Sequence, residues 1–161
     1  MENKSALLVG VGGQGAILAA KVLVTGLMRA GYDVKMSEVH GMSQRGGSVS
    51  TQVHWGEKVY SPVIGDGAAD IIVAFEKMEA VRYANYLKPD GVAVINDYEM
   101  ASSTIAAELG NVKCANIVLF GSMVKALNMT DIDWDAVISD VVPVKFRELN
   151  LKAYHAGFDA V

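Results

Sequence analysis

Cysteine is almost absent from this sequence, since Cys114 is the only one among 161 residues. One thiol forms no disulfide within the chain and cannot by itself hold an iron–sulfur cluster or a structural zinc ion. Sparse cysteine is typical of proteins in a reducing compartment. We therefore expect a cytoplasmic protein with no metal site of its own.

An excess of basic charge and a long apolar run are also missing. The formal net charge is −4, whereas nucleic-acid-binding domains usually carry a basic surface. Neither the N-terminal residues nor the later apolar run at 117–120 has the length of a signal peptide or a membrane span. We therefore expect neither nucleic acid nor membrane among the partners of this chain.

The remaining composition is that of a folded protein. Hydrophobic residues make up 52% of the chain and charged residues 20%, which excludes a disordered sequence. At 161 residues the chain is long enough to bury a core without disulfides. We predict one domain over residues 1–161.

A glycine-rich stretch at 6–15, ALLVGVGGQG, reads as a strand, a tight turn and the start of a helix. Gly10, Gly12 and Gly15 have the G-x-G-x-x-G spacing in which glycines allow a sharp turn and the helix N-terminus holds an anion. A close strand-to-helix crossing needs the same glycines without any ligand. This loop alone supports phosphate binding and a purely structural role equally.

Two expected helices are more apolar than a surface helix needs to be. In the helix at 14–30 the polar residues gather on one side, and the helix at 115–127 is almost free of charge. A helix that covers one face of a sheet needs only an apolar stripe. We predict that a partner chain or a second layer covers the rest of the first helix, and that the second helix is buried in the core or by a neighbour.

Glu38 raises an alternative function. It lies near the end of the strand expected at 32–39, where a dinucleotide-binding fold has an acid for a ribose hydroxyl. This favours a stand-alone Rossmann-type nucleotide-binding oxidoreductase. However, a polar loop at 40–48 and a strand at 49–55 take the place of the crossover helix that such a fold requires. The nicotinamide-binding hypothesis is therefore weakened.

The rest of the chain alternates strands and helices. Further strands are expected at 59–63, 71–75 and 92–95, the first as the second arm of a hairpin with 49–55. Further helices are expected at 76–86, 102–109, 134–141 and from Pro143 onward. We predict an α/β fold of three layers, with a mostly parallel, Rossmann-like sheet and an inserted β-hairpin.

Candidate catalytic and binding residues are few. His40 and Arg45 share the glycine-rich loop and suit an anionic substrate or a diphosphate, although the loop would equally fold against itself or a partner. His54 and His155 are expected on the surface. The loop acids are expected in turns and caps; they are Asp66, Asp70, Asp97 and Glu99. We assign no catalytic residue.

Several blocks in order resemble a known family. They are GVGGQG at 10–15, AAKVL at 19–23, SEVHGMSQRGGSVSTQV at 37–53, SPVIGDGAADIIVAFE at 61–76, LKPDGVAVIND at 87–97 and AELGNVKCANIVLFGSMVKAL at 107–127. Together they resemble the gamma-type domain of 2-oxoacid:ferredoxin oxidoreductases, and within that family the beta subunits of the indolepyruvate enzymes.

The resemblance implies a subunit of an enzyme that oxidatively decarboxylates aryl pyruvates to acyl-CoA and reduces ferredoxin. Thiamine diphosphate and iron–sulfur clusters are then expected in a partner alpha subunit, with coenzyme A as co-substrate and no cofactor on this chain alone. The isolated chain is expected to be inactive and able to self-associate. The resemblance also implies that nine loop residues bind a cofactor or face the shared active site: Gly12, Gly13, Gln14, Gly15, His40, Gln44, Arg45, Gly46 and Gly47.

The sequence departs from the family pattern at one place. Between Asp97 and Ala107 the connection is shorter than the family leads us to expect, around Met100 and Ala101. Either this member is trimmed or residues are missing there. The number of strands in the sheet depends on which alternative holds.

Overall fold

The computed structural model describes residues 2–43, 45–97 and 101–161. Five strands form one sheet: β1 (Lys4–Val11), β2 (Asp33–His40), β3 (Ser48–Gly56), β4 (Ala69–Ala74) and β5 (Leu87–Ile95). The helices are α1 (Ala16–Arg29), α2 (Lys77–Arg82), α3 (Ser102–Glu108), α4 (Ala115–Ala126), α5 (Trp134–Val141) and α6 (Arg147–Asp159). Three 3₁₀ turns complete the list: η1 (Ala84–Tyr86), η2 (Val112–Cys114) and η3 (Val144–Phe146).

The strand order in the sheet is β2-β3-β1-β4-β5. β1 pairs with β4 and β4 with β5 in parallel, whereas β3 is antiparallel to both of its neighbours, β1 and β2. The prediction of a mostly parallel sheet is therefore confirmed only in part, because two of the four strand pairings are parallel. The short connection at 41–47 explains the difference, because it can join β2 to β3 only as antiparallel neighbours.

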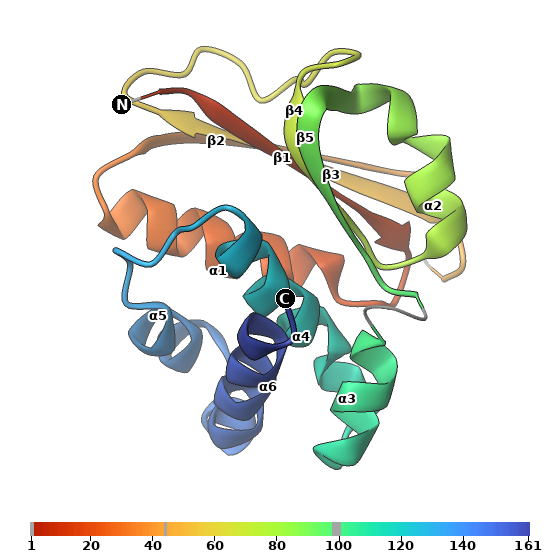
Figure 1. Cartoon of the computed structure of the whole chain (residues 1–161), viewed down its shortest axis with the longest axis vertical. Coiled ribbons are helices and arrows are strands. Elements are labelled where there is room, and N and C mark those ends of the chain that lie inside the picture. Colours follow the sequence, from red (N-terminus) through yellow and green to blue (C-terminus); the bar gives the residue numbers. More distant parts are fainter. Residues whose placement is uncertain (1, 44, 98–100) are drawn as a thin grey trace.

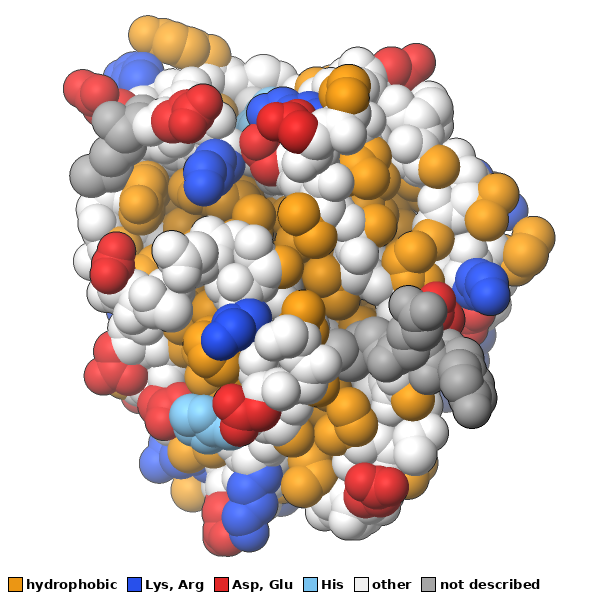
Figure 2. Space-filling model, in the orientation of Figure 1, with side chains coloured by type: hydrophobic (Ala, Val, Ile, Leu, Met, Phe, Trp, Pro, Cys, Tyr) orange, Lys and Arg blue, Asp and Glu red, His pale blue; other side chains and the backbone are white. Residues whose placement is uncertain are grey.

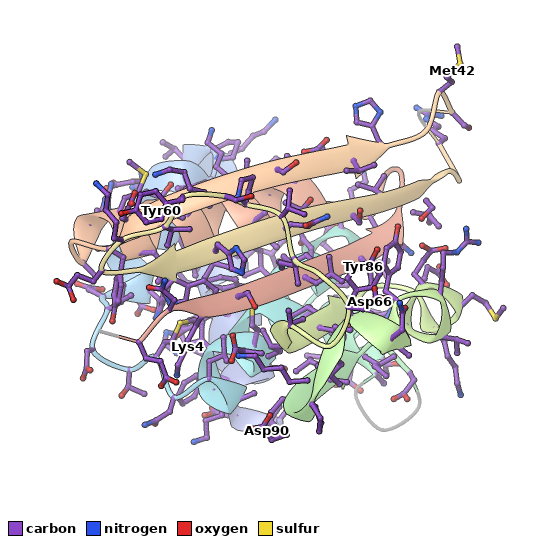
Figure 3. All side chains as sticks on the ribbon, turned by 90° about the horizontal axis from the view of Figure 1, so that it is seen from above. Lys4, Met42, Tyr60, Asp66, Tyr86 and Asp90 are labelled. Atoms are coloured by element: carbon purple, nitrogen blue, oxygen red, sulfur yellow. The ribbon has the colours of Figure 1, made fainter. Side chains whose placement is uncertain are left out.

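The inserted hairpin is present, but the prediction of its two arms was wrong. β2 and β3 are its arms, while residues 59–63 form no strand. The 59–63 segment instead crosses the outer face of the sheet (Figure 3), where Val59 and Ile64 are buried. Just after this segment, the Ile64 amide donates a hydrogen bond to the Gln52 side-chain oxygen at 2.6 Å. A side-chain acceptor thus takes the place of the backbone carbonyl that a neighbouring strand would supply.

Five helices gather on one face of the sheet, with α2 set apart from them (Figure 1). α1 and α4 touch the sheet, and α3, α5 and α6 lie behind them. The larger core lies on this side, and a smaller core on the outer face includes Leu7, Val9, Ile72 and Ala80. The space-filling view shows apolar side chains reaching the surface of the helical layer between scattered charges (Figure 2).

The chain's own second layer covers α4. Every residue from Asn116 to Val124 is buried, and α6 packs closely along this helix. A Cβ atom added to Gly157 of α6 would lie 1.8 Å from the Val118 carbonyl oxygen, and one added to Gly121 would lie 2.2 Å from the Tyr154 carbonyl oxygen. The two backbones are therefore nearly in contact, and the second-layer alternative explains this helix without a partner chain.

α1 is covered in the same way on one side. Gly26 lies against the ring of Trp134 in α5, where an added Cβ would be 2.2 Å from Cζ3. The Trp134 indole N–H donates to the Met129 carbonyl at 2.8 Å. Ile17 and Met28 on the opposite side of α1 remain 54% and 63% exposed. Part of the apolar surface of α1 is thus left uncovered by this chain.

The helix predicted at 134–141 is confirmed as α5, and the other predicted elements exist with shifted ends. The helix expected at 76–86 is divided into α2 and η1, and the final helix begins at Arg147 after η3. β5 begins at Leu87 rather than Val92, because the expected turn at 88–91 is a bulge within the strand opposite Asp70. Over the described ranges, no helix has the length and hydropathy to cross a membrane.

Candidate functional site

A cleft lies where the parallel strands end. After β1 the chain passes through α1 to β2, at one edge of the sheet, whereas β4 pairs with the opposite side of β1. The order of the strands therefore reverses at β1. Ligands of open α/β sheets bind in the crevice outside the strands' carboxyl ends at such a reversal. The cleft there measures about 470 Å³, and it is lined by Gly13, Gln14, Gly15, Phe75, Asn96, Ser102, Ser103, Val112, Lys113, Ala115, Asn116 and Leu119.

The glycine loop forms one wall of this cleft. Gly15 is the N-cap of α1 in the left-handed conformation, with φ of 78°, and no side chain within the described residues caps the helix. A Cβ on Gly10 would lie 2.9 Å from the Phe75 Cβ. The fold therefore requires glycine at both ends of the motif, Gly10 and Gly15, whether or not a ligand binds. Because the N-cap residue Gly15 also lines the cleft, the structural and anion-binding interpretations of the loop are compatible.

Gln14 is held in place from two sides. Its side-chain oxygen accepts a hydrogen bond from the Val11 amide at 2.9 Å, and its side-chain amide donates to Glu76 Oε1 at 2.8 Å. Glu76 directly precedes α2. The glycine loop is thereby fixed to the segment that follows β4.

Asn116 joins two helix N-termini. Its side-chain amide donates to the Gly15 carbonyl at 3.1 Å, and its side-chain oxygen accepts from the Ile117 amide at 2.9 Å. The residue is only 4% exposed. Since Asn116 belongs to the first turn of α4, this pair fixes the start of α4 beside the start of α1.

The opposite wall carries further polar groups. The Ser102 hydroxyl donates to the Asn96 side-chain oxygen at 2.6 Å, and the Asn96 amide donates to the Ser103 hydroxyl at 3.2 Å. Lys113 lines the same cleft, and no carboxylate of the described part of the chain forms an ion pair with it. A lysine, side-chain amides and hydroxyls beside uncapped helix N-termini form a donor set that suits an anion.

The second glycine-rich loop lies beside the first. The Gly12 amide donates to the Gly47 carbonyl at 2.9 Å, and the Gly46 amide donates to the Gly12 carbonyl at 3.5 Å. The structure therefore brings together the predicted residues 12–15 and 46–47. Figure 3 shows the tip of this loop, marked by Met42, extending away from the body of the protein.

His40 and Arg45 do not join the cleft. Both are exposed, neither lines the cleft, and the nearest polar contact of the His40 ring is the Gly41 carbonyl, 3.0 Å from Nδ1. Gln44 lies outside the described residues. The predicted set thus divides into a glycine loop that lines the cleft and a hairpin loop that projects past it.

Glu38 is not placed as a dinucleotide fold requires. It pairs with Thr51 of β3, and Thr51 pairs in turn with Leu8 of β1. A whole strand therefore separates Glu38 from the strand that leads into the glycine loop. The position of Glu38 therefore does not support the stand-alone nucleotide-binding hypothesis.

Sequence reasoning missed five polar residues of the cleft, including Ser103. Asn96 follows a buried strand, which is a weak sequence signal for a site, and Ser102, Lys113 and Asn116 lie at or just before helix starts. Each position has an ordinary role in capping or in a turn. Only the tertiary fold shows that these three segments meet at the glycine loop.

Cys114 lies just behind the cleft. It is 3% exposed, and burial raises the pKa of its thiol, which donates a hydrogen bond to the Asn111 carbonyl. The thiol is therefore protonated and shielded at neutral pH. In the ranges 2–43, 45–97 and 101–161, no cluster of three or more His, Cys, Asp or Glu side chains is placed to hold a metal ion.

Comparison with known proteins agrees over nearly the whole chain. The family described as pyruvate ferredoxin/flavodoxin oxidoreductase matches residues 5–160. The indolepyruvate oxidoreductase subunit IorB of Thermococcus kodakarensis is 34% identical, and the match covers 99% of this chain and 96% of the relative. That alignment spans 195 positions against 161 residues here, so the relative carries residues that this chain lacks.

Solved structures have the same fold. The gamma subunit of a keto/oxoacid ferredoxin oxidoreductase from Geobacter sulfurreducens has a TM-score of 0.79 at 25% identity, covering 98% of this chain and 97% of that one. A 2-oxoglutarate:ferredoxin oxidoreductase from Magnetococcus marinus has a TM-score of 0.85 at 21% identity, where the match covers 99% of this chain but 31% of the other. The fold is thus found both as a separate subunit and as part of a longer chain.

Proposed function

Because this chain belongs to the pyruvate ferredoxin/flavodoxin oxidoreductase family, we propose that it is a subunit of a 2-oxoacid:ferredoxin oxidoreductase of the indolepyruvate type. The single observation that carries the proposal is the 34% identity to subunit IorB over nearly the full length of both chains. In the proposed reaction an aryl pyruvate loses carbon dioxide, its acyl group is transferred to coenzyme A, and the electrons released reduce ferredoxin.

The cofactors are proposed to lie in a partner alpha subunit. Thiamine diphosphate there would supply the electron sink for decarboxylation, and iron–sulfur clusters would supply the route for electrons. This chain contributes binding groups at the boundary with that subunit. Its complex is proposed to work in the cytoplasm.

The cleft and the two glycine-rich loops are proposed to face the shared active site. The oxoacid carboxylate and the phosphates of coenzyme A are both anions, and the Magnetococcus enzyme was solved with 2-oxoglutarate, coenzyme A and succinyl-CoA bound. Lys113, Asn116 and the uncapped first turn of α1 supply positive charge and N–H donors. They hold one of these anions where the two subunits meet.

Reconstitution tests the proposal. The chain is co-expressed with a thiamine-dependent alpha subunit, and complex formation is measured together with ferredoxin reduction driven by indolepyruvate. We expect a stable complex that turns over and an isolated chain that does not. Turnover by the isolated chain, or no binding to the alpha subunit, would contradict the proposal. Micromolar binding of NAD, NADP or FAD that Gly12→Val abolishes would instead favour a nucleotide-binding enzyme.

A further inference from the structure

Glu79 is the one carboxylate that is buried within the described residues, at 4% exposure. A buried carboxylate is destabilising unless hydrogen bonds and opposite charge compensate for its lost hydration. Glu79 lies in the short helix α2, beside the smaller core. An apolar residue at this position would avoid the desolvation penalty, so the contacts that Glu79 makes are what distinguishes it from such a residue.

Its contacts lead to the base of the hairpin loop. Glu79 Oε2 accepts a hydrogen bond from the Ser48 hydroxyl at 2.5 Å, and Oε1 lies 3.3 Å from Arg82 Nε. The Arg82 side chain is 63% exposed, so this ion pair is weakened by solvent, whereas the bond to Ser48 is shielded. Ser48 is the first residue of β3, directly after loop 41–47.

The same short segment also holds the glycine loop. Glu76, three positions before Glu79, accepts the hydrogen bond from the Gln14 side chain at 2.8 Å. Between the two held points, Gly12 and Gly47 are joined by a backbone hydrogen bond of 2.9 Å. The start of α2 therefore contacts both loops, one through each glutamate, at the place where the loops touch.

We propose that Glu79 is a positioning residue: through Ser48 it fixes the hairpin loop 41–47 against the glycine loop, so that α2 holds both loops in one arrangement. The importance of this arrangement for turnover rests on the proposed function, in which the loops face the alpha subunit. Within the described residues, neither polar partner of Glu79, Ser48 or Arg82, lines the cleft. It determines where the hairpin loop leaves the sheet.

Amide hydrogen exchange, followed by NMR on the 161-residue chain, tests the proposal without any assay of activity. Glu79→Ala and Ser48→Ala remove the two sides of the hydrogen bond, while Glu79→Gln keeps an acceptor oxygen of similar reach. We expect exchange of the Gly12 and Gly46 amides to become about tenfold faster or more in both alanine variants. Exchange in Glu79→Gln should stay near that of the original chain.

Two internal controls accompany the measurement. Amides of β4 at 71–74 report global opening and should not change, and Lys152→Ala removes an exposed ion pair with Glu148 far from the loops. Unchanged exchange at Gly12 and Gly46 in Glu79→Ala overturns the proposal. Faster exchange in β4 as well as in the loops also overturns it, because the carboxylate would then only stabilise the fold.

The assembled complex separates this inference from the proposed function. In Glu79→Ala we expect KM for coenzyme A or for the oxoacid to rise while kcat is largely kept, with recovery in Glu79→Gln. If the loop amides exchange faster but both KM values and the affinity for the alpha subunit are unchanged, the positioning role stands. In that case the placement of the loops at the shared active site is wrong.

Discussion

The side-chain amide of Asn116 donates a hydrogen bond to the carbonyl oxygen of Gly15 at 3.1 Å, which ties the first turn of α4 to the N-cap residue of α1. The two residues are far apart in the sequence, and both line the cleft. The closeness of this contact leaves no room for a side chain on Gly15. This contact predicts how substitution of Gly15 changes the free energy of unfolding, and Gly13 provides the control.

Gly15→Ala should destabilise the chain more than Gly13→Ala. Both glycines have positive φ, of 78° and 99°, so either alanine adopts a left-handed conformation at a penalty of about 1–2 kcal/mol. Only at Gly15 would the new Cβ also meet Asn116, at 2.5 Å from Nδ2, whereas Gly13 has open space. Urea unfolding of the two variants measures the difference, and Asn116→Ala should reduce it. Equal free energies of unfolding would contradict the contact.

Gly157→Ala should be among the most damaging single-methyl changes in the helical layer. The new Cβ would lie 1.8 Å from the Val118 carbonyl oxygen, so α6 must move away from α4. Overpacking of this kind is destabilising by about 1–3 kcal/mol or more. Gly65→Ala is the matched control, because Gly65 has open space and no positive φ. A melting temperature that falls equally in both variants would count against the close helix pair.

Lys113→Gln should weaken anion binding in the assembled complex. The variant removes the cleft's lysine charge but keeps a polar side chain, so we expect KM for coenzyme A or for the oxoacid to rise about tenfold at similar kcat. Measuring the two KM values separately identifies which anion the cleft holds. Lys152→Gln on α6 is the control. If neither KM changes, the cleft does not bind a substrate anion.

Asp33 should contribute to acid sensitivity. The Lys35 side chain and the Val59 amide lower the pKa of this carboxyl below its ordinary 3.8. A lowered native pKa gives stability that is present above pH 3.8 and is lost as the pH falls through the native value. Asp33→Asn should therefore flatten the fall in unfolding free energy between about pH 5 and pH 2. Parallel pH profiles for both chains would refute this contribution.

Cys114 should react slowly with thiol reagents in the native chain. The side chain is 3% exposed and burial raises its pKa, so both access and the thiolate fraction are reduced. Labelling with a disulfide reagent at pH 8 should be complete in urea and strongly retarded without it. Rapid labelling of the native chain would show that the region behind the cleft opens readily.

The predictable part of the fold is the part with a strong repeating pattern. The run at 71–75 and the apolar helices at 14–30 and 115–127 were placed correctly to within a few residues, because each buries a long apolar surface. The 59–63 segment failed, since its apolar residues suit a strand and a covering segment equally. In the structure the Gln52 side chain accepts a hydrogen bond from the Ile64 amide, which in a hairpin would be bonded to the backbone of the neighbouring strand.

The candidate site was predictable from the sequence only where its residues follow one another in a single segment. Glycine spacing identified the loop at 10–15 and, through the family resemblance, the loop at 41–47 that lies beside it. Asn96, Lys113 and Asn116 escaped notice, because a single polar residue near an element end has many uses. Their meeting depends on how α3 and α4 pack against the sheet, which no local pattern specifies.

The antiparallel pairing of β2 with β3 also bears on how the chain acquires its structure during synthesis. A hairpin closed by a loop of a few residues forms in microseconds, whereas the pairings of β1 with β3 and with β4 must each bring together segments tens of residues apart. Because β3 is translated before β4, we expect three of the five strands, β2-β3-β1, to assemble while the later strands are still being translated. Until β4 arrives, the nascent chain exposes one unpaired edge of β1, the edge most at risk of pairing with another copy.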